Sequence, residues 1–167
     1  MHTGLYVVMG VAGSGKTLIG AMFGRALDIM FVDGDDLHPD ENVKRMAAGI
    51  PLTDEDRHGW LLEIAARLQV AQRAGIGLVV ACSALKRRYR DLLRTKGDAG
   101  VRFVLLQGDE PLLAERLAQR RGHFMPPALL ASQLATLEAP SPDEGAWVID
   151  IRETPEAIVA DLVRRVA

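Results

Sequence analysis

The amino-acid sequence predicts an α/β domain with a five-stranded parallel sheet flanked by helices. Short apolar runs rich in Val, Ile and Leu alternate with longer stretches in which apolar residues recur at three- and four-residue steps. The short runs are apolar throughout, which is typical of strands covered on both faces. The chain has 167 residues, with no internal repeat or low-complexity linker. We therefore expect one domain spanning residues 1–167.

The expected elements follow from these patterns in chain order. Strands are expected at 5–9, 29–33, 78–83, 102–107 and 147–150. Helices are expected at about 16–27, 41–48, 54–74, 85–94, 111–121, 126–136 and 155–166. The helix at 54–74 has the clearest signature. Its apolar residues share one face, and acidic residues occupy its first turn, where the helix dipole favours anions.

Composition excludes several classes of protein. The 20 Lys+Arg and 22 Asp+Glu leave a net charge of −2, so no nucleic-acid partner is expected. The apolar run at 5–12 is too short to span a bilayer, and no membrane partner is expected. The lone Cys82 permits no intramolecular disulfide, which fits a cytoplasmic location. With no base nearby in the sequence, Cys82 is expected to be a small buried residue.

A phosphate-binding loop follows the first expected strand. Residues Gly10-Val11-Ala12-Gly13-Ser14-Gly15-Lys16-Thr17 match the pattern G-x-x-x-x-G-K-[ST] and precede a helical stretch. Glycines let successive backbone N–H groups turn toward one centre, and the helix N-terminus adds a positive dipole. We expect Lys16 to reach the β- and γ-phosphates of ATP and the Thr17 hydroxyl to ligate Mg²⁺.

An acidic segment ends the second expected strand. Asp33 and Asp35 are two residues apart on an extended segment, so they share a face at the carboxyl edge of the sheet, where doubly wound folds bind ligands. One carboxylate suits Mg²⁺ and the other suits the acceptor hydroxyl. Asp36 fits a surface or capping role equally well.

Two basic segments are candidates for anion binding. Between Lys86 and Arg94 lie five cations, of which Lys86 and Arg90 share a face close to the end of the third strand and suit an anionic substrate group. Farther along, Arg116 and Arg120 share a helix face, and Arg120 suits the charge on a transferring phosphoryl group. The loop after Arg120 is a candidate lid with Gly122 as hinge, and His123 is equally consistent with substrate contact or packing.

The motifs themselves leave the acceptor open. A sugar-acid kinase, another small-molecule kinase with a shikimate-like or nucleotide acceptor, and a non-catalytic nucleotide-binding module all use such a loop.

Several separate blocks resemble the gluconate kinases (gluconokinases), small P-loop sugar-acid kinases related to shikimate and nucleoside monophosphate kinases. Besides the phosphate loop, the blocks are Asp33-Gly34-Asp35 with Leu37-His38-Pro39 and Asn42; Pro51-Leu52 with Asp54, Asp56-Arg57 and Trp60-Leu61; Cys82-Ser83-Ala84-Leu85-Lys86 with Tyr89-Arg90-Asp91; and Gly122-His123-Phe124-Met125 with Ser132-Gln133 and Leu137-Glu138. One departure is Arg45, where the family pattern leads us to expect Lys.

The resemblance implies a P-loop NTPase fold of the nucleoside monophosphate kinase type. It also implies transfer of the γ-phosphoryl group of ATP to the 6-hydroxyl of D-gluconate by a cytoplasmic homodimer. An acceptor-binding segment is expected at about 34–75 and a lid at about 121–139.

Carried over residue by residue, the resemblance assigns the ATP phosphates to the loop from Gly10 to Thr17. Thr17 and Asp33 are assigned to Mg²⁺, and the catalytic residues are Lys16, Asp35 and Arg120. Arg116 and Arg120 are expected at the nucleotide, near an adenine loop at 150–155. The candidates for contact with the sugar acid are Asp35, Lys86, Arg90, His123 and Gln133.

Overall fold

The computed structural model describes residues 2–97, 100–120 and 127–167, and it contains the five-stranded, all-parallel sheet that the sequence predicts. The strand order is β2-β3-β1-β4-β5, so the strand that leads into the phosphate loop is central. Val7 of β1 lies opposite Val80 of β3 on one side and Phe103 of β4 on the other. The strands are β1 (Leu5–Met9), β2 (Met30–Asp33), β3 (Leu78–Ala81), β4 (Val101–Gln107) and β5 (Trp147–Asp150).

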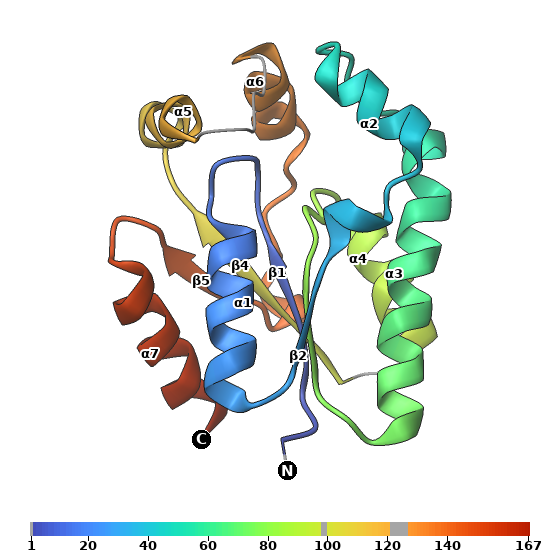
Figure 1. Cartoon of the computed structure of the whole chain (residues 1–167), viewed down its shortest axis with the longest axis vertical. Coiled ribbons are helices and arrows are strands. Elements are labelled where there is room, and N and C mark those ends of the chain that lie inside the picture. Colours follow the sequence, from blue (N-terminus) through green and yellow to red (C-terminus); the bar gives the residue numbers. More distant parts are fainter. Residues whose placement is uncertain (1, 98–99, 121–126) are drawn as a thin grey trace.

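The helices of the described residues form a layer on each face of the sheet (Figure 1). They are α1 (Lys16–Leu27), α2 (Asp40–Ala47), α3 (Asp54–Ala74), α4 (Arg87–Gly97), α5 (Glu110–Gln119), α6 (Pro127–Thr136) and α7 (Pro155–Val166), with 3₁₀ turns at Gly34–Leu37 and Pro142–Glu144. Helices α3 and α4 cover one face, and α1 and α7 cover the other. Helices α2, α5 and α6 lie above the carboxyl edge of the sheet (Figure 1).

Two hydrophobic cores hold these layers, one on each face. Ile64 and Leu68 of α3 pack against Val7 and Val80, whereas Phe23 of α1 packs against Val8 on the opposite face. The alternation follows from the period of two along a strand, which points successive side chains to opposite faces. Both faces of β1 are therefore covered by helices, and its carboxyl end is the part that leads into a loop at the edge of the sheet.

Helix α3 begins and ends as its sequence dictates. Thr53 accepts a hydrogen bond from the backbone N–H of Asp56 at 3.1 Å, and the Asp56 carboxylate accepts one from the N–H of Thr53 at 2.9 Å. This reciprocal capping box satisfies two N–H groups that the first helical turn leaves without partners. Gly75, at φ 68°, ends the helix in the left-handed region.

Most expected boundaries agree with the structure within two residues, and differences concern element ends. The expected third strand, 78–83, ends at Ala81, and the helix expected to start at 85 starts at Arg87. The intervening residues form an irregular connection in which Ala84 has φ 45°. Cys82 is fully buried as expected, and burial raises the pKa of its thiol to about 12. The assignments of 34–75 to the acceptor and 121–139 to a lid stay predictions.

Candidate active site

The phosphate loop joins the end of β1 to the start of α1 and has the backbone that its glycines allow. Gly13 and Gly15 lie at φ 83° and 95°, which side-chain-bearing residues rarely adopt. A Cβ on Gly13 would approach the backbone oxygen of Leu113 to 2.9 Å. Because α1 starts at Lys16, the free N–H groups of its first turn face the loop, as anion binding requires.

Lys16 folds back over this loop. Its Nζ donates to the backbone oxygen of Val11 at 3.0 Å. Desolvation lowers the pKa of Lys16, while the negative charges of Asp35 and Asp33 act in the opposite direction. Lys16 therefore lies close to the acidic segment, and an arriving phosphate would add to the charges that keep it protonated.

Thr17 and Asp33 form the hydroxyl and carboxylate pair expected for Mg²⁺. Thr17 Oγ1 donates to Asp33 Oδ2 at 2.9 Å, and the N–H of Asp35 donates to Asp33 Oδ1 at 3.0 Å. These hard oxygen donors suit Mg²⁺, which keeps waters and takes its other ligands from phosphates. Within the described residues, no group of three His, Cys, Asp or Glu side chains forms an all-protein metal site.

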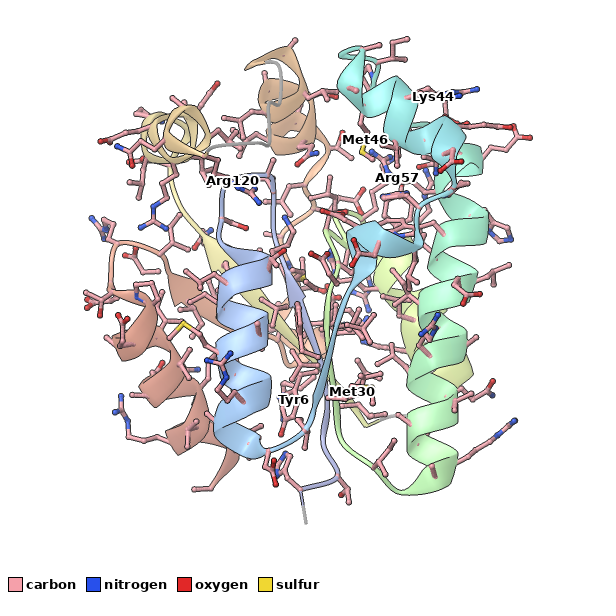
Figure 2. All side chains as sticks on the ribbon, in the orientation of Figure 1. Tyr6, Met30, Lys44, Met46, Arg57 and Arg120 are labelled. Carbon is pink, nitrogen blue, oxygen red and sulfur yellow. The ribbon has the colours of Figure 1, made fainter. Side chains whose placement is uncertain are left out.

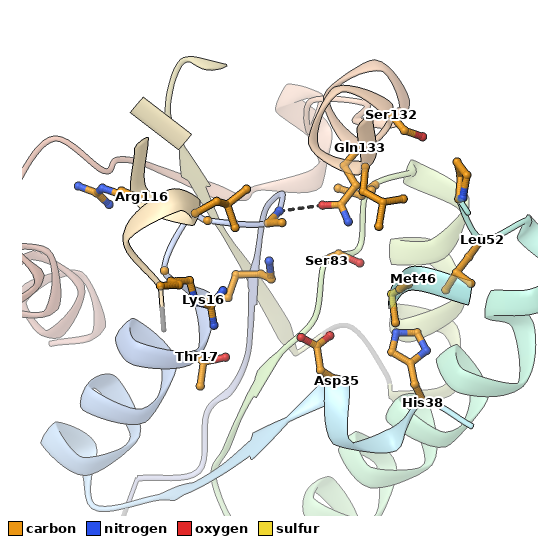
Figure 3. Close-up of a pocket in the computed structure, with 18 of the residues that line it drawn as sticks. Lys16, Thr17, Asp35, His38, Met46, Leu52, Ser83, Arg116, Ser132 and Gln133 are labelled. Atoms are coloured by element: carbon orange, nitrogen blue, oxygen red, sulfur yellow. Dashed lines mark hydrogen bonds between the residues drawn. The ribbon is translucent and has the colours of Figure 1, made fainter. Parts of the chain in front are cut away.

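One cavity of about 460 Å³ is lined by the phosphate loop and by Asp35 of the acidic segment (Figure 3). Lys16 and Thr17 lie at one end, His38, Met46 and Leu52 at the other, and the Asp35 carboxylate lies between them (Figure 3). The described residues that line it are Ala12, Gly13, Gly15, Lys16, Thr17, Leu18, Asp35, His38, Met46, Pro51, Leu52, Arg57, Trp60, Ser83, Leu85, Arg116, Leu117, Arg120, Leu129, Ser132, Gln133 and Pro155.

Arg116 and Arg120 border the phosphate-loop end of this cavity. Arg116 donates to the backbone oxygen of Ile151, in the loop between β5 and α7, and Arg120 lies directly after α5. The positive charge of Arg120 also contributes to the lowered pKa of Lys16, after desolvation. The residues expected at the nucleotide are thus brought together from three separate segments, and their role there stays a prediction.

Gln133 of α6 makes a direct contact with the phosphate loop. Its Oε1 accepts a hydrogen bond from the backbone N–H of Ala12 at 2.7 Å, the dashed line in Figure 3. Gln133 also lines the cavity, and its expected contact with the sugar acid stays a prediction. Figure 3 also shows that α6 spans the top of the cavity between the two ends.

Two expected sugar-acid contacts lie elsewhere. Arg90 is fully buried: its guanidinium pairs with Glu144 at 2.7 Å and donates to the backbone oxygens of Ala84 and Glu138. Arg90 is absent from the described lining residues. Its assignment to the acceptor is therefore corrected: Arg90 holds neighbouring segments of the chain together. Lys86 Nζ pairs with Asp54 at 3.0 Å and is likewise absent from that lining. His123 lies outside the described residues.

Sequence reasoning missed several residues at the end of the cavity away from the phosphate loop. His38 stacks on Trp60 with ring centroids 4.0 Å apart, and Trp60 Nε1 donates to the backbone oxygen of Gly34 at 2.7 Å. Arg57, in the first turns of α3, lines the same wall (Figure 2). These residues belong to the blocks shared with the gluconate kinases, but nothing in their spacing shows that α2 and α3 form one wall. That arrangement depends on tertiary contacts, such as Asn42 Nδ2 donating to the backbone oxygen of Asp56.

The fold and the site together define a P-loop kinase of small molecules. The phosphate loop and the Asp35 carboxylate line one cavity, and Thr17, at the end of the loop, is hydrogen-bonded to Asp33. A family model described as an AAA domain matches residues 5–140. By its similarity to curated relatives, the chain belongs to the gluconokinase family.

The relatives cover most of the chain. The thermosensitive gluconokinase of Escherichia coli K12 is 49% identical, over 83% of this chain and 74% of that protein. The gluconokinase of Gluconobacter oxydans is 45% identical, over 95% and 88%. The crystal structure of a gluconokinase from Sinorhizobium meliloti 1021 superposes with a TM-score of 0.88 at 46% identity and covers 98% of this chain and 93% of that one.

Proposed function

We propose that this protein transfers the γ-phosphoryl group of ATP to the 6-hydroxyl of D-gluconate. The observation that carries the proposal is the position of Asp35, whose carboxylate opens into the cavity between the phosphate loop and a separate wall formed by α2 and α3. Gluconokinases at 45–49% identity support gluconate as the acceptor. The cavity, at about 460 Å³, falls within the usual range for small-molecule sites.

The proposed chemistry divides among few residues. The phosphates of ATP bind to the loop from Gly10 to Thr17, with Lys16 at the β- and γ-oxygens. The acceptor oxygen attacks the γ-phosphorus, its proton passes to the Asp35 carboxylate, and the bond from phosphorus to the β–γ bridging oxygen breaks to release ADP. Arg120 stabilises the charge that develops on the transferring group. Arg116 holds the nucleotide near the loop between β5 and α7.

Mg²⁺ is the proposed metal, held by Thr17 and Asp33. Bound there, it supplies neutralisation of the negative charge on the β- and γ-phosphates. The present hydrogen bond from Thr17 to Asp33 already brings both oxygens to one place. Asp33 also accepts the N–H of Asp35, so the residue that binds the metal and the residue that takes the proton are held in fixed relation.

We further propose that the protein acts as a homodimer in the cytoplasm. The resemblance to the gluconokinase family supports both statements, and the single, buried Cys82 fits a reducing compartment. Among the described helices, none is both long and apolar enough to cross a membrane. Light scattering coupled to gel filtration measures the oligomeric state directly.

An ADP-release assay tests the proposed activity. Turnover is expected to require Mg²⁺ and to increase strongly when D-gluconate is added, with 6-phosphogluconate as the product. Parallel reactions with shikimate and with nucleoside monophosphates cover the other acceptors that this fold accommodates. If a folded preparation releases ADP no faster with gluconate than without, the proposed function is wrong.

A further inference from the structure

The cavity has two ends of different character. The end at the phosphate loop carries Lys16, Arg116 and Arg120, three cations suited to a triphosphate. The opposite wall is formed mainly by the uncharged residues His38, Met46, Pro51, Leu52 and Trp60. Among the described lining residues, Arg57 is the one cation of this wall. In Figure 2 it lies beside Met46, across the upper part of the molecule from Arg120.

Arg57 is held in place without being neutralised. Its Nη1 donates to the hydroxyl oxygen of Tyr89 at 3.0 Å, and its guanidinium carbon lies 5.6 Å from the centre of the Tyr89 ring. In the part of the chain that the structure describes, no carboxylate lies within ion-pairing distance of Arg57. Its neighbours differ in this respect, because Arg45 pairs with Asp56 and Arg88 pairs with Asp54.

A chain of polar contacts fixes Tyr89 in turn. The Tyr89 hydroxyl donates to Asp54, so its oxygen remains free to accept from Arg57. Asp54 also binds Lys86 Nζ at 3.0 Å. Tyr89 is 4% exposed, and its ring is therefore fixed by packing. Lys86 thus contributes to the support of Arg57, and its expected contact with the acceptor stays a prediction.

We infer that Arg57 binds the carboxylate of the acceptor and thereby selects sugar acids over neutral polyols. This inference rests on the proposed function, whose acceptor carries its carboxylate at C1 and its reacting hydroxyl at C6. A carboxylate is repelled by the phosphates of ATP, so the favourable orientation places it at the end of the cavity away from the phosphate loop. Arg57 offers there a planar fork with unused N–H groups.

The surroundings of Arg57 suit the rest of such an acceptor. Burial lowers the pKa of His38, and the charge of Arg57 acts in the same direction while Asp35 opposes it. His38 is therefore neutral at pH 7 and offers hydrogen bonds to hydroxyls without competing for the carboxylate. The apolar surfaces of Met46 and Leu52 suit the C–H groups of an extended carbon chain.

A neutral analogue of gluconate gives the first test. D-Glucitol has the same carbon chain with a hydroxymethyl group in place of the carboxylate. For the wild-type protein, the inhibition constant of D-glucitol is expected to exceed the KM for D-gluconate by about 10²-fold, since D-glucitol leaves the partly buried charge of Arg57 without a partner. A wild-type protein that turns over gluconate but binds both compounds equally well would overturn the inference.

Substitution of Arg57 gives the second test. Arg57→Gln is expected to raise the KM for D-gluconate by about 10²–10³-fold and to leave the inhibition constant of D-glucitol and the affinity for ADP within about threefold of wild type. Arg57→Lys keeps the positive charge but lacks the planar guanidinium, so its KM for D-gluconate is expected to lie between those of the wild type and Arg57→Gln. The matched control is Arg67→Gln, at an exposed position of the same helix, which is expected to behave as wild type.

The outcomes separate this inference from the proposed function. Absence of gluconate turnover in the wild-type protein rejects the function itself. If the wild type turns over gluconate normally and Arg57→Gln has an unchanged KM for gluconate, only the role of Arg57 is rejected. The same conclusion follows if Arg57→Gln loses affinity for gluconate and for D-glucitol equally. ADP binding and a thermal unfolding curve show whether each variant is folded. If Arg57→Gln does not fold, the KM for gluconate of Arg57→Lys provides the test.

Discussion

Arg90 and Glu144 form an ion pair inside the protein, with Arg90 Nε 2.7 Å from Glu144 Oε1 and side chains that are 0% and 1% exposed. Arg90 Nη1 also donates to the backbone oxygen of Ala84 at 2.8 Å. Ala84 has the positive φ of 45°, which residues other than glycine rarely adopt. The preceding residue, Ser83, lines the cavity, and its backbone oxygen accepts the N–H of Gly10. The buried pair therefore supports the connection between β3 and α4, which borders the phosphate loop.

Removing only one partner of this pair is expected to be costly. In Arg90→Met, Glu144 loses one of its two arginine partners, and the backbone oxygens of Ala84 and Glu138 lose a donor in the interior. We expect a loss of about 3 kcal/mol in the free energy of unfolding, the low end for a broken buried pair because Arg94 still contacts Glu144. The double variant Arg90→Met/Glu144→Met is expected to recover part of this loss. Urea denaturation measures both, with the exposed Arg88→Met as control; a loss below about 1 kcal/mol in Arg90→Met would contradict the argument.

The same carboxylate makes stability depend on pH. Burial alone would raise the pKa of Glu144, but hydrogen bonds from Arg90 and Arg94 outweigh it and lower the pKa from 4.5 to about 2. Between these values the unfolded state binds more protons than the folded state, so the contribution of Glu144 is complete above about pH 4.5 and is lost as the pH falls toward 2.

Glu144→Gln isolates this effect from other acids. The pKa values of Asp56, Asp143 and Asp150 are also lowered, so the wild-type profile contains several contributions. The variant is expected to be less stable than wild type at neutral pH, with a difference that shrinks between pH 4.5 and 2. Thermal unfolding at a series of pH values measures the difference. A gap that stays constant through this window would show that Glu144 titrates normally in the folded protein.

Asp35→Asn tests the assignment of the proton acceptor. The amide keeps the shape of the side chain but does not accept the proton of the attacking hydroxyl, so kcat is expected to fall by about 10²–10⁴-fold. ATP affinity is expected to change little, because Lys16 and the loop amides hold the phosphates. Steady-state kinetics give kcat and the KM for ATP, and titration with ADP gives the nucleotide affinity independently. Asp36→Asn, the adjacent substitution, is the matched control, and an unchanged kcat in Asp35→Asn would remove that residue from the chemistry.

Gln133→Glu tests the contact between α6 and the phosphate loop. The carboxylate still accepts the N–H of Ala12 but places a negative charge where ATP phosphates are proposed to bind. The KM for ATP is expected to rise on the order of tenfold, through like-charge repulsion at a partly exposed site. Gln69→Glu, on α3 away from the described cavity lining, is expected to leave this KM unchanged. Equal ATP KM values in the two variants would place Gln133 away from the bound phosphates.

The sequence predicted best what depends on local pattern. The strand at Leu5–Met9 and the helix at Asp54–Ala74 have the expected boundaries because apolar period and capping residues define them locally. The phosphate loop followed from its glycines and Lys16. Arg90 was misassigned because helical spacing shows which residues share a face but not what that face meets. Its partner Glu144 lies 54 positions away, in a 3₁₀ turn that the pattern did not predict. Arg57 was overlooked for the same reason, since its role depends on Tyr89, 32 positions away.

The two walls of the cavity also differ in how the chain supplies them. The residues opposite the phosphate loop, from Asp35 to Trp60, come from one continuous stretch, whereas the described residues at the phosphate-loop end come from the loop, α5, α6 and the start of α7. A change of acceptor could therefore arise in evolution through recombination or successive substitution within one short piece of the gene. The part that handles the nucleotide would remain untouched.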